Sequence, residues 1–288
     1  MVKRRIFAAM VLCDDICRFL KDNGVDHTTG KVADLDVIYI SEEASILPVS
    51  IRAKNLEEAA QWSASIKSAA SEITKVSGEY PLIITEDRWH FRPEAMKARL
   101  LAHLQIFTQI YARNCEVRKI DKQTAAEFLA ANHSYQDASC RYRYGLYLKR
   151  HTGHNAGHVD IAAGTLVAVA TFSNARKWIK GEKTIRSYEW TRYASLPGVR
   201  LSGGMGKILK VFIEEVNPDD IMTYADLEWS QGKVYEALGF KIEGHKEPVC
   251  FRVDASWRRL PLKTAMTGDF YFQNLGSNKY RLKLTDYQ

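Results

Sequence analysis

The spacing of apolar and polar positions predicts an α/β fold along the whole chain. In the first part, apolar residues recur at helical spacing over 11–23, 56–76 and 93–104, and short apolar runs at 35–40, 46–52 and 81–85 favour strands. Pro48 inside the second run indicates a strand edge or a bulge, because proline has no backbone N–H to donate. The expected buried face of the longest helix consists of Ala59, Trp62, Ile66, Ala69, Ala70 and Ile73.

The second part of the chain is richer in strand patterns. Strands are expected at 115–120, 145–148, 164–172, 185–194, 220–225, 241–243 and 249–253, and helices at 122–132, 207–216 and 232–238. A polar, His-rich loop joins the strands at 145–148 and 164–172, which indicates a hairpin, and another hairpin is expected at 269–284. The pattern therefore predicts a second α/β domain, preceded by a small α/β domain.

The predicted elements divide near residue 112. We expect an α/β domain over 1–112, a second domain over 113–256 and a C-terminal hairpin tail over 257–288. No Pro/Gly/Ser-rich linker marks the border, so the first two domains are expected to pack together.

Composition and charge narrow the class of partner. Hydrophobic residues make up 46% of the chain, but no run approaches the roughly 18–20 apolar residues of a membrane span, so no membrane partner is expected. The net charge of +7 favours an anionic partner such as a nucleic acid or a phosphorylated cofactor. The 5 cysteines are scattered and odd in number, which indicates a reducing cytoplasm rather than a disulfide framework.

A glycine-rich turn lies between a predicted strand and a predicted helix. Gly203, Gly204 and Gly206 leave room for backbone N–H groups to approach a ligand, and a helix start carries partial positive charge. Lys207 directly afterwards adds a full charge. The turn therefore predicts a phosphate site, the alternative being a glycine turn used only for tight packing.

The downstream stretch Tyr235-Glu-Ala-Leu-Gly-Phe240 resembles a segment found late in GNAT acyltransferases. The resemblance extends in element order from about Cys115 to Val253, and it implies a GNAT-like mixed sheet with flanking helices. It implies that the glycine turn holds the pyrophosphate of a donor such as acetyl-CoA and that Tyr235 protonates the departing thiolate. Leu201 departs from the family, in which the turn begins with a polar residue.

A series of anchors in fixed order resembles a narrower group, the GNAT-like domain of phage proteins related to the DNA-modification protein Mom. The anchors lie at 132–136, 145–147, 168–173, 188–192, 203–207, 223–226 and 229–235. This resemblance implies DNA as the partner and a host cytoplasm as the location. The catalytic candidates that it implies are His133, Tyr135, Asp226, Ser230 and Tyr235.

These candidates suit proton transfer, although each has a structural alternative. The ordinary pKa of histidine, near 6.5, suits proton removal from an amine by His133. Asp226 ends an apolar strand, which is where ligands bind in α/β sheets. The alternatives are a helix cap for His133 or Asp226 and a core aromatic for Tyr235.

Basic and aromatic residues alternate in two stretches that predict DNA binding. Basic side chains neutralise phosphates, and aromatic rings stack on a base that has left the duplex. The candidates are Arg141, Arg143, Tyr144, Arg176, Lys177 and Trp178, and the alternative is an ordinary charged edge. Arg192, in the anchor at 188–192, is a further candidate for a phosphate, the alternative being an ion pair with Glu189. His151, His154 and His158 have metal-like spacing, but with only Asp160 nearby they favour a solvated loop, so no metal is predicted.

The first domain resembles the Vsr-like, PD-(D/E)XK-type nuclease modules that are joined to such GNAT-like domains. Asp36 fits the first metal ligand, but the next strand offers Ser50 and Arg52 where a second carboxylate is expected, and Lys54 as the basic residue. The module is therefore expected to be degenerate. We expect a transferase that adds an acyl or aminoacyl group to an amine or hydroxyl on a DNA base. The alternatives are a homing- or repair-type endonuclease and a non-catalytic DNA-binding protein.

Overall fold

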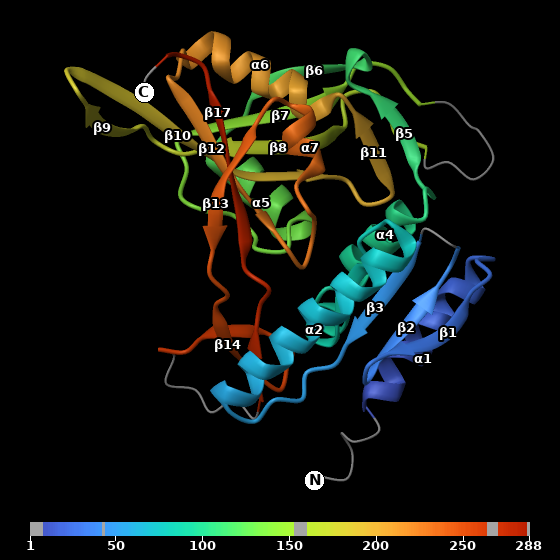
Figure 1. Ribbon diagram of the computed structural model, residues 1–288. Helices are drawn as coiled ribbons and strands as arrows, with labels where there is room; N and C mark the ends of the chain where they lie inside the picture. Colours follow the sequence, from blue (N-terminus) through green and yellow to red (C-terminus); the bar gives the residue numbers. More distant parts are fainter. Residues whose placement is uncertain (1–7, 42–43, 153–159, 264–269, 287–288) are drawn as a thin grey trace. The chain divides into compact units, whose positions relative to one another are not determined.

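The computed structural model describes residues 8–41, 44–152, 160–263 and 270–286, which form two compact units (Figure 1). Unit 1 comprises residues 1–96, 226–231 and 245–277, and unit 2 comprises residues 97–225, 232–244 and 278–288. The expected contiguous domains at 1–112, 113–256 and 257–288 differ from this grouping, because the chain passes between the units several times. No described helix is long and apolar enough to cross a membrane.

Unit 1 begins with a four-stranded sheet and its helices. The elements are α1 (Ala8–Asp22), β1 (Thr28–Val32), β2 (Leu35–Tyr39), β3 (Ser45–Val49), α2 (Leu56–Ser77), β4 (Leu82–Thr85) and α3 (Glu86–Phe91). The next helix, α4 (Pro93–His103), begins in unit 1 and continues into unit 2. The strand order is β1-β2-β3-β4, antiparallel except for the parallel pair of β3 and β4. Pro48 lies in an internal strand, but the register between β3 and β2 ends at Ile46, so Pro48 costs no ladder hydrogen bond there.

Helix α2 forms where the apolar spacing predicts it. The side chain of Asn55 accepts a hydrogen bond from the N–H of Glu58, and the Glu58 carboxylate accepts one from the N–H of Lys54, the residue before the N-cap. This is a variant of the capping box. Gly78, at φ 77°, ends the helix in the left-handed conformation. All of the predicted face from Ala59 to Ile73 is buried, as expected.

A second, three-stranded sheet completes unit 1. It has the order β15-β14-β16, from β14 (Cys250–Val253), β15 (Arg259–Pro261) and β16 (Phe270–Gln273). Val253 and Phe272 share one apolar core with Trp62 and Ile66 of α2. The expected hairpin at 269–284 does not form, because β16 pairs with β14 while the following strand lies in the sheet of unit 2.

Unit 2 is built on an eight-stranded mixed sheet. Its path is β13-β17-β12-β10-β8-β7-β6, and β9 pairs with β10 beside this path. The strands are β6 (Cys115–Lys119), β7 (Tyr142–Leu148), β8 (Leu166–Phe172), β9 (Arg176–Lys180), β10 (Lys183–Ser195), β12 (Asp220–Asp226), β13 (Lys241–Lys246) and β17 (Ser277–Lys283). The predicted α/β class, a mixed sheet with flanking helices, is confirmed, as is the hairpin of β7 and β8.

Unit 2 also contains three helices: α5 (Lys122–Asn132), α6 (Gly204–Val216) and α7 (Lys233–Ala237). A separate pair of parallel strands consists of β5 (Thr108–Tyr111) and β11 (Val199–Ser202). Asp121 caps α5 through the N–H of Thr124, as expected. Apolar residues of α6 pack on the sheet, where the rings of Phe212 and Phe172 stack with centroids 3.9 Å apart. The core therefore lies between α6 and the middle strands.

Candidate functional site

The parallel strands β10 and β12 separate towards their carboxyl ends. Their register covers only Ser187–Glu189 and Asp220–Met222, although β10 continues to Ser195 and β12 to Asp226. An irregularity in the pairing of β10 with β8, between Trp190 and Arg192, accompanies this separation. Beyond these residues β10 and β12 no longer pair with each other, while β10 still pairs with β8 and β12 with β17.

The start of α6 lies at the same edge. This helix belongs to the connection between β10 and β12, so it runs back against the strand direction and begins where β10 ends. Gly203 precedes it at φ 75°, a left-handed conformation that favours glycine, and supplies no side-chain cap. The first-turn N–H groups of α6 therefore have the character of an anion site.

The three glycines of the turn differ in their surroundings. Gly203 is exposed and Gly206 is half-buried, whereas Gly204 is buried. A Cβ added to Gly204 would lie 2.6 Å from the Leu201 side chain and 3.1 Å from the Tyr193 hydroxyl. Gly204 therefore serves close packing, which is the alternative considered for the turn, and the backbone at Gly203 and Gly206 is the part that a ligand could approach.

Lys207, predicted to add charge to the phosphate site, holds the start of α6 in place. Its ammonium group donates hydrogen bonds to the carbonyl oxygens of Ala112, at 2.9 Å, and Cys115, at 2.6 Å. These bonds tie α6 to the start of β6. They use two of the three N–H donors of the ammonium group, so its contact with a cofactor phosphate stays a prediction.

Tyr235 on α7 lies between the separated strands. It is half-buried and packs against Trp190 of β10, Phe240 and Tyr280. Burial raises the pKa of its phenol, and a hydrogen bond with Thr223 of β12 opposes that rise. The Thr223 hydroxyl in turn donates to the carbonyl oxygen of Trp190, at 3.0 Å. Tyr235 is therefore both a packed aromatic and a protonated hydroxyl that contacts Trp190 of β10 and Thr223 of β12.

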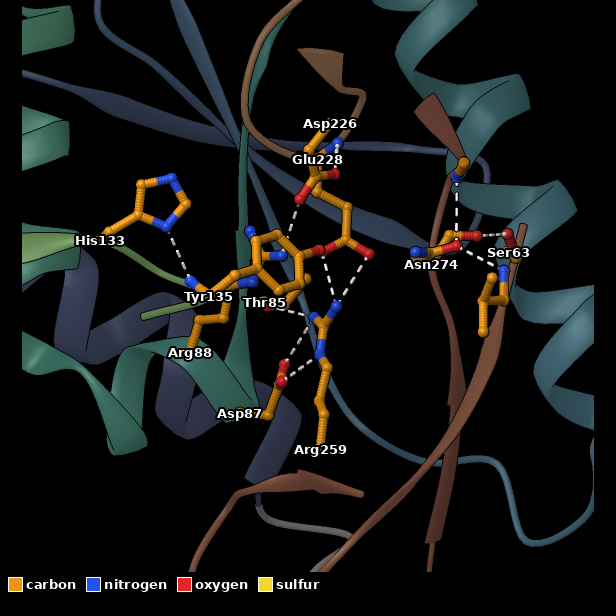
Figure 2. A network of polar contacts seen from close by, with 12 residues as sticks. Ser63, Thr85, Asp87, Arg88, His133, Tyr135, Asp226, Glu228, Arg259 and Asn274 are labelled. Carbon is orange, nitrogen blue, oxygen red and sulfur yellow. Dashed lines mark hydrogen bonds and ion pairs between the residues drawn. The ribbon is translucent and has the colours of Figure 1, made fainter. Parts of the chain in front are cut away.

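His133, Tyr135 and Arg192 lie near one another. The N–H of Tyr135 donates to His133 Nδ1 at 3.0 Å (Figure 2). The neutral imidazole then carries its proton on Nε2, so proton removal by His133 requires this hydrogen bond to break. The Arg192 guanidinium lies 6.0 Å from the centre of the Tyr135 ring and donates to the carbonyl oxygen of Gln136 at 3.0 Å. Burial lowers the pKa of Arg192.

Asp226 and Ser230 belong to unit 1. The Asp226 carboxylate accepts hydrogen bonds from Arg88, at 2.9 Å, and from the N–H of Glu228, at 3.0 Å (Figure 2). An ion-paired carboxylate is a weak base, so this contact opposes the predicted role of Asp226 as a proton acceptor. Ser230 is exposed, and its N–H donates to the Asp226 carbonyl oxygen.

The network around Asp226 contains buried charges that sequence reasoning missed. Arg259 donates to both oxygens of Glu228, at 2.8 and 3.1 Å, and to both oxygens of Asp87, at 2.5 and 3.2 Å. Arg88 lies 3.1 Å from Glu228 as well. Burial raises the pKa of Glu228, and Arg259 and Arg88 oppose that rise. The one sequence signal was the run of charges at 86–88 directly after an apolar strand, which a solvent-facing helix start would also explain.

The predicted DNA-binding residues fall into two groups. Tyr144 is only 1% exposed and its hydroxyl donates to Glu215, so it is a core residue, and the prediction that it stacks a base is wrong. Arg143 is half-buried and donates to the carbonyl oxygen of Cys140. By contrast, Arg141, Arg176 and Lys177 are exposed, and Trp178 is half-buried.

The described residues contain no group of three or more His, Cys, Asp or Glu side chains that could hold a metal ion. His151 Nε2 lies 2.5 Å from an Asp160 oxygen, and His154 and His158 lie outside the described residues.

A small cavity in unit 1, of about 40 Å³, brings together the residues expected at a degenerate nuclease site. Asp36, Ser50 and Arg52 line it, and so does Asp34, a second carboxylate that the strand pattern did not indicate. Asp36 pairs with Lys31 at 3.2 Å, and the Arg52 guanidinium lies 3.3 Å from the centre of the Trp62 ring. The likeness of unit 1 to a nuclease module stays a prediction.

No protein-family model and no curated protein matches the sequence. Solved structures that it resembles include an acetyltransferase from Bacillus subtilis in complex with CoA, at 12% identity and TM-score 0.36 over 59% of this chain and 99% of the other. A spermidine N-acetyltransferase from Vibrio cholerae matches at 12% identity and TM-score 0.36, over 59% and 94%. A GNAT-family acetyltransferase from Bacillus anthracis matches at 14% identity and TM-score 0.33, over 59% of this chain and 95% of the other. At these values the likeness assigns neither an activity nor a substrate to this chain.

Proposed function

We propose that unit 2 transfers an acyl or aminoacyl group from a phosphorylated donor, such as acetyl-CoA, to an amine or hydroxyl on a base in DNA. The observation that carries this proposal is the separation of β10 and β12 at the edge where α6 begins. Ligands bind at the carboxyl ends of parallel strands, and an uncapped helix start favours an anionic group there.

The residues at this edge fit an acyl donor of that class. The backbone N–H groups at the start of α6 would hold its phosphates, since Gly203 supplies no competing cap. When bound, such a donor supplies the activated acyl group. Tyr235 carries a proton at neutral pH, as an ordinary phenol does, and burial raises its pKa further. It can therefore donate that proton to a departing anion.

DNA is the proposed acceptor because charge and sequence resemblance agree on it. The net charge of +7 favours a polyanion, and the ordered anchors from 132 to 235 resemble Mom-like DNA-modification domains. His133, Tyr135 and Arg192, close together beside the irregularity in β10, supply polar, aromatic and cationic groups for a base and its phosphate.

Mass analysis of nucleosides tests the proposal directly. DNA from cells that produce the full chain is digested and compared with DNA from cells that produce Tyr235→Phe. We expect a nucleoside of increased mass with the full chain and much less of it with the variant. An unchanged nucleoside profile, together with no detectable binding of CoA in calorimetry, would overturn the proposal.

Plasmid incubation separates the alternatives. Nicking with Mg²⁺ or Mn²⁺ that Asp36→Ala abolishes would favour the endonuclease instead. DNA binding with neither activity would favour a non-catalytic DNA-binding protein.

A further inference from the structure

A two-stranded ribbon, formed by β9 and the first residues of β10, concentrates positive charge in unit 2. Within 176–186, Arg176, Lys177, Lys180, Lys183 and Arg186 are basic, and Glu182 is the one acid. Among the described strands β9 pairs only with β10, and β10 meets β12 and β8 only from Ser187 onwards. Figure 1 shows the two strands running out past the rest of the sheet to their turn.

The register of this ribbon sets like charges against each other. Lys180 lies opposite Lys183, and Lys177 lies opposite Arg186. Like charges directly opposite one another destabilise a strand pair, and a ribbon of two strands has little stability to spare. Asp219 moderates one of these pairs, at 3.6 Å from Arg186. A polyanion bound along the ribbon would reduce the repulsion within both pairs.

The ribbon also presents apolar surface that serves no core. The Ile179 side chain is 78% exposed, opposite Thr184 near the turn. Trp178 is half-buried opposite the buried Ile185, and the Lys180 ammonium lies 5.9 Å from the centre of its ring. An exposed apolar side chain flanked by cations suits a partner that offers phosphates on both sides and an apolar group, such as the thymine methyl, between them.

We infer that the β9–β10 ribbon enters a groove of duplex DNA, with its basic side chains on the flanking phosphates and Ile179 directed at the base edges. The major groove of B-form DNA, about 12 Å wide, admits a two-stranded ribbon, whereas the deep, narrow major groove of A-form RNA does not. This inference rests on the proposed function for the choice of DNA, and it identifies the element that holds the acceptor.

The salt dependence of duplex binding by the full chain tests the inference. The slope of log K against log salt concentration is negative, and each lost phosphate contact should reduce its magnitude by about 0.9. We expect Lys177→Ala, Lys180→Ala and Lys183→Ala each to lower it by about that amount. Lys241→Ala, an exposed lysine on strand β13, is the matched control and should leave the slope unchanged. Thermal unfolding confirms that each variant is folded.

The possible outcomes distinguish DNA binding by the ribbon from the proposed acyl transfer. Transfer to a free nucleoside should be equal in the wild type and the three ribbon variants, because the ribbon holds the duplex only. Unchanged slopes in all three variants would overturn the inference even where DNA is modified. Equal affinity for duplex RNA of the same length would overturn groove insertion. Reduced slopes without any modified base would support the ribbon and count against the proposed transferase.

Discussion

At the scale of single residues, Tyr235 combines two properties that sequence reasoning treated as alternatives. It packs against Trp190, Phe240 and Tyr280, and its hydroxyl bonds with Thr223 on β12. Packing and chemistry support each other here, because the burial that makes it a core aromatic also raises its pKa and keeps it protonated.

Replacing this hydroxyl tests its role as a proton donor. Tyr235→Phe should lower kcat for acyl transfer by about 100-fold while the fold is retained. Since the pKa of Tyr235 is raised, the wild-type rate should hold through neutral pH and fall only as alkaline pH removes the proton. The variant should lack this alkaline fall. Tyr147→Phe, a half-buried tyrosine on β7, is the control; equal rates and pH profiles for all three proteins would contradict the role.

Arg259 illustrates how much a single buried charge can matter to stability. Asp87 and Glu228 are each 2% exposed, and Arg259 pairs with both. Burial opposes the ionisation of Asp87, but Arg259 outweighs it and holds the pKa of Asp87 below its usual range.

Removing this guanidinium should be costly. Arg259→Met leaves buried acids without their main partner, so the free energy of unfolding should fall by about 3–5 kcal/mol at neutral pH. A carboxyl with a depressed pKa stabilises the fold above its unfolded pKa, and this contribution is lost as pH falls. The difference in free energy of unfolding between wild type and Arg259→Met, measured by urea titration, should therefore shrink below about pH 4. Arg258→Met, which removes a half-exposed pair with Asp254, should cost no more than about 1 kcal/mol.

At the scale of elements, local pattern explains what sequence could predict. Helix α2 combines an apolar face, a capping box and a final glycine, and the prediction for 56–76 matches the helix at Leu56–Ser77. Strand β9 was not predicted as a strand, because Arg176–Lys180 has no apolar alternation and pairs only through its partner β10. The start of α6 was placed at 207 instead of Gly204, since three glycines and a methionine give no helical signal.

The packing role of Gly204 can be separated from ligand binding. Gly204→Ala would bring a methyl group to 2.6 Å from Leu201, so it should destabilise the protein by about 1–3 kcal/mol. Gly244→Ala, where nothing lies within 4 Å of the added atom, should be neutral in the same denaturation measurement. A Gly204→Ala protein that keeps its stability and loses only CoA affinity would show that the residue lines the ligand instead.

At the scale of the whole molecule, long-range pairing is what the sequence could not reveal. The pattern gave the strands and their order along the chain, but not that β17 lies between β12 and β13. A turn-like segment before Ser277 indicated a hairpin, whereas its two strands find partners in different sheets. Likewise, nothing local in Asp226 indicates an ion pair with Arg88, 138 residues earlier.

The interior position of β17 gives a test of the expected boundaries. A fragment of residues 113–256 retains β12 and β13 but lacks the strand between them, so we expect no cooperative thermal unfolding from it. Residues 1–284 keep β17 and should unfold as the full chain does. A sharp transition for the shorter fragment would show that the expected second domain folds without this strand.

The position of strand β17 also has a consequence for the order in which the sheet is completed during synthesis. The ribosome makes β13 first and reaches Lys283 only 37 residues after Lys246. At roughly 5–20 residues synthesised per second, β17 is completed about 2–7 s after β13. During that interval β12 has an open side in the cell, which is a natural point for a chaperone to bind. Slow codons between residues 247 and 276 would lengthen this exposure.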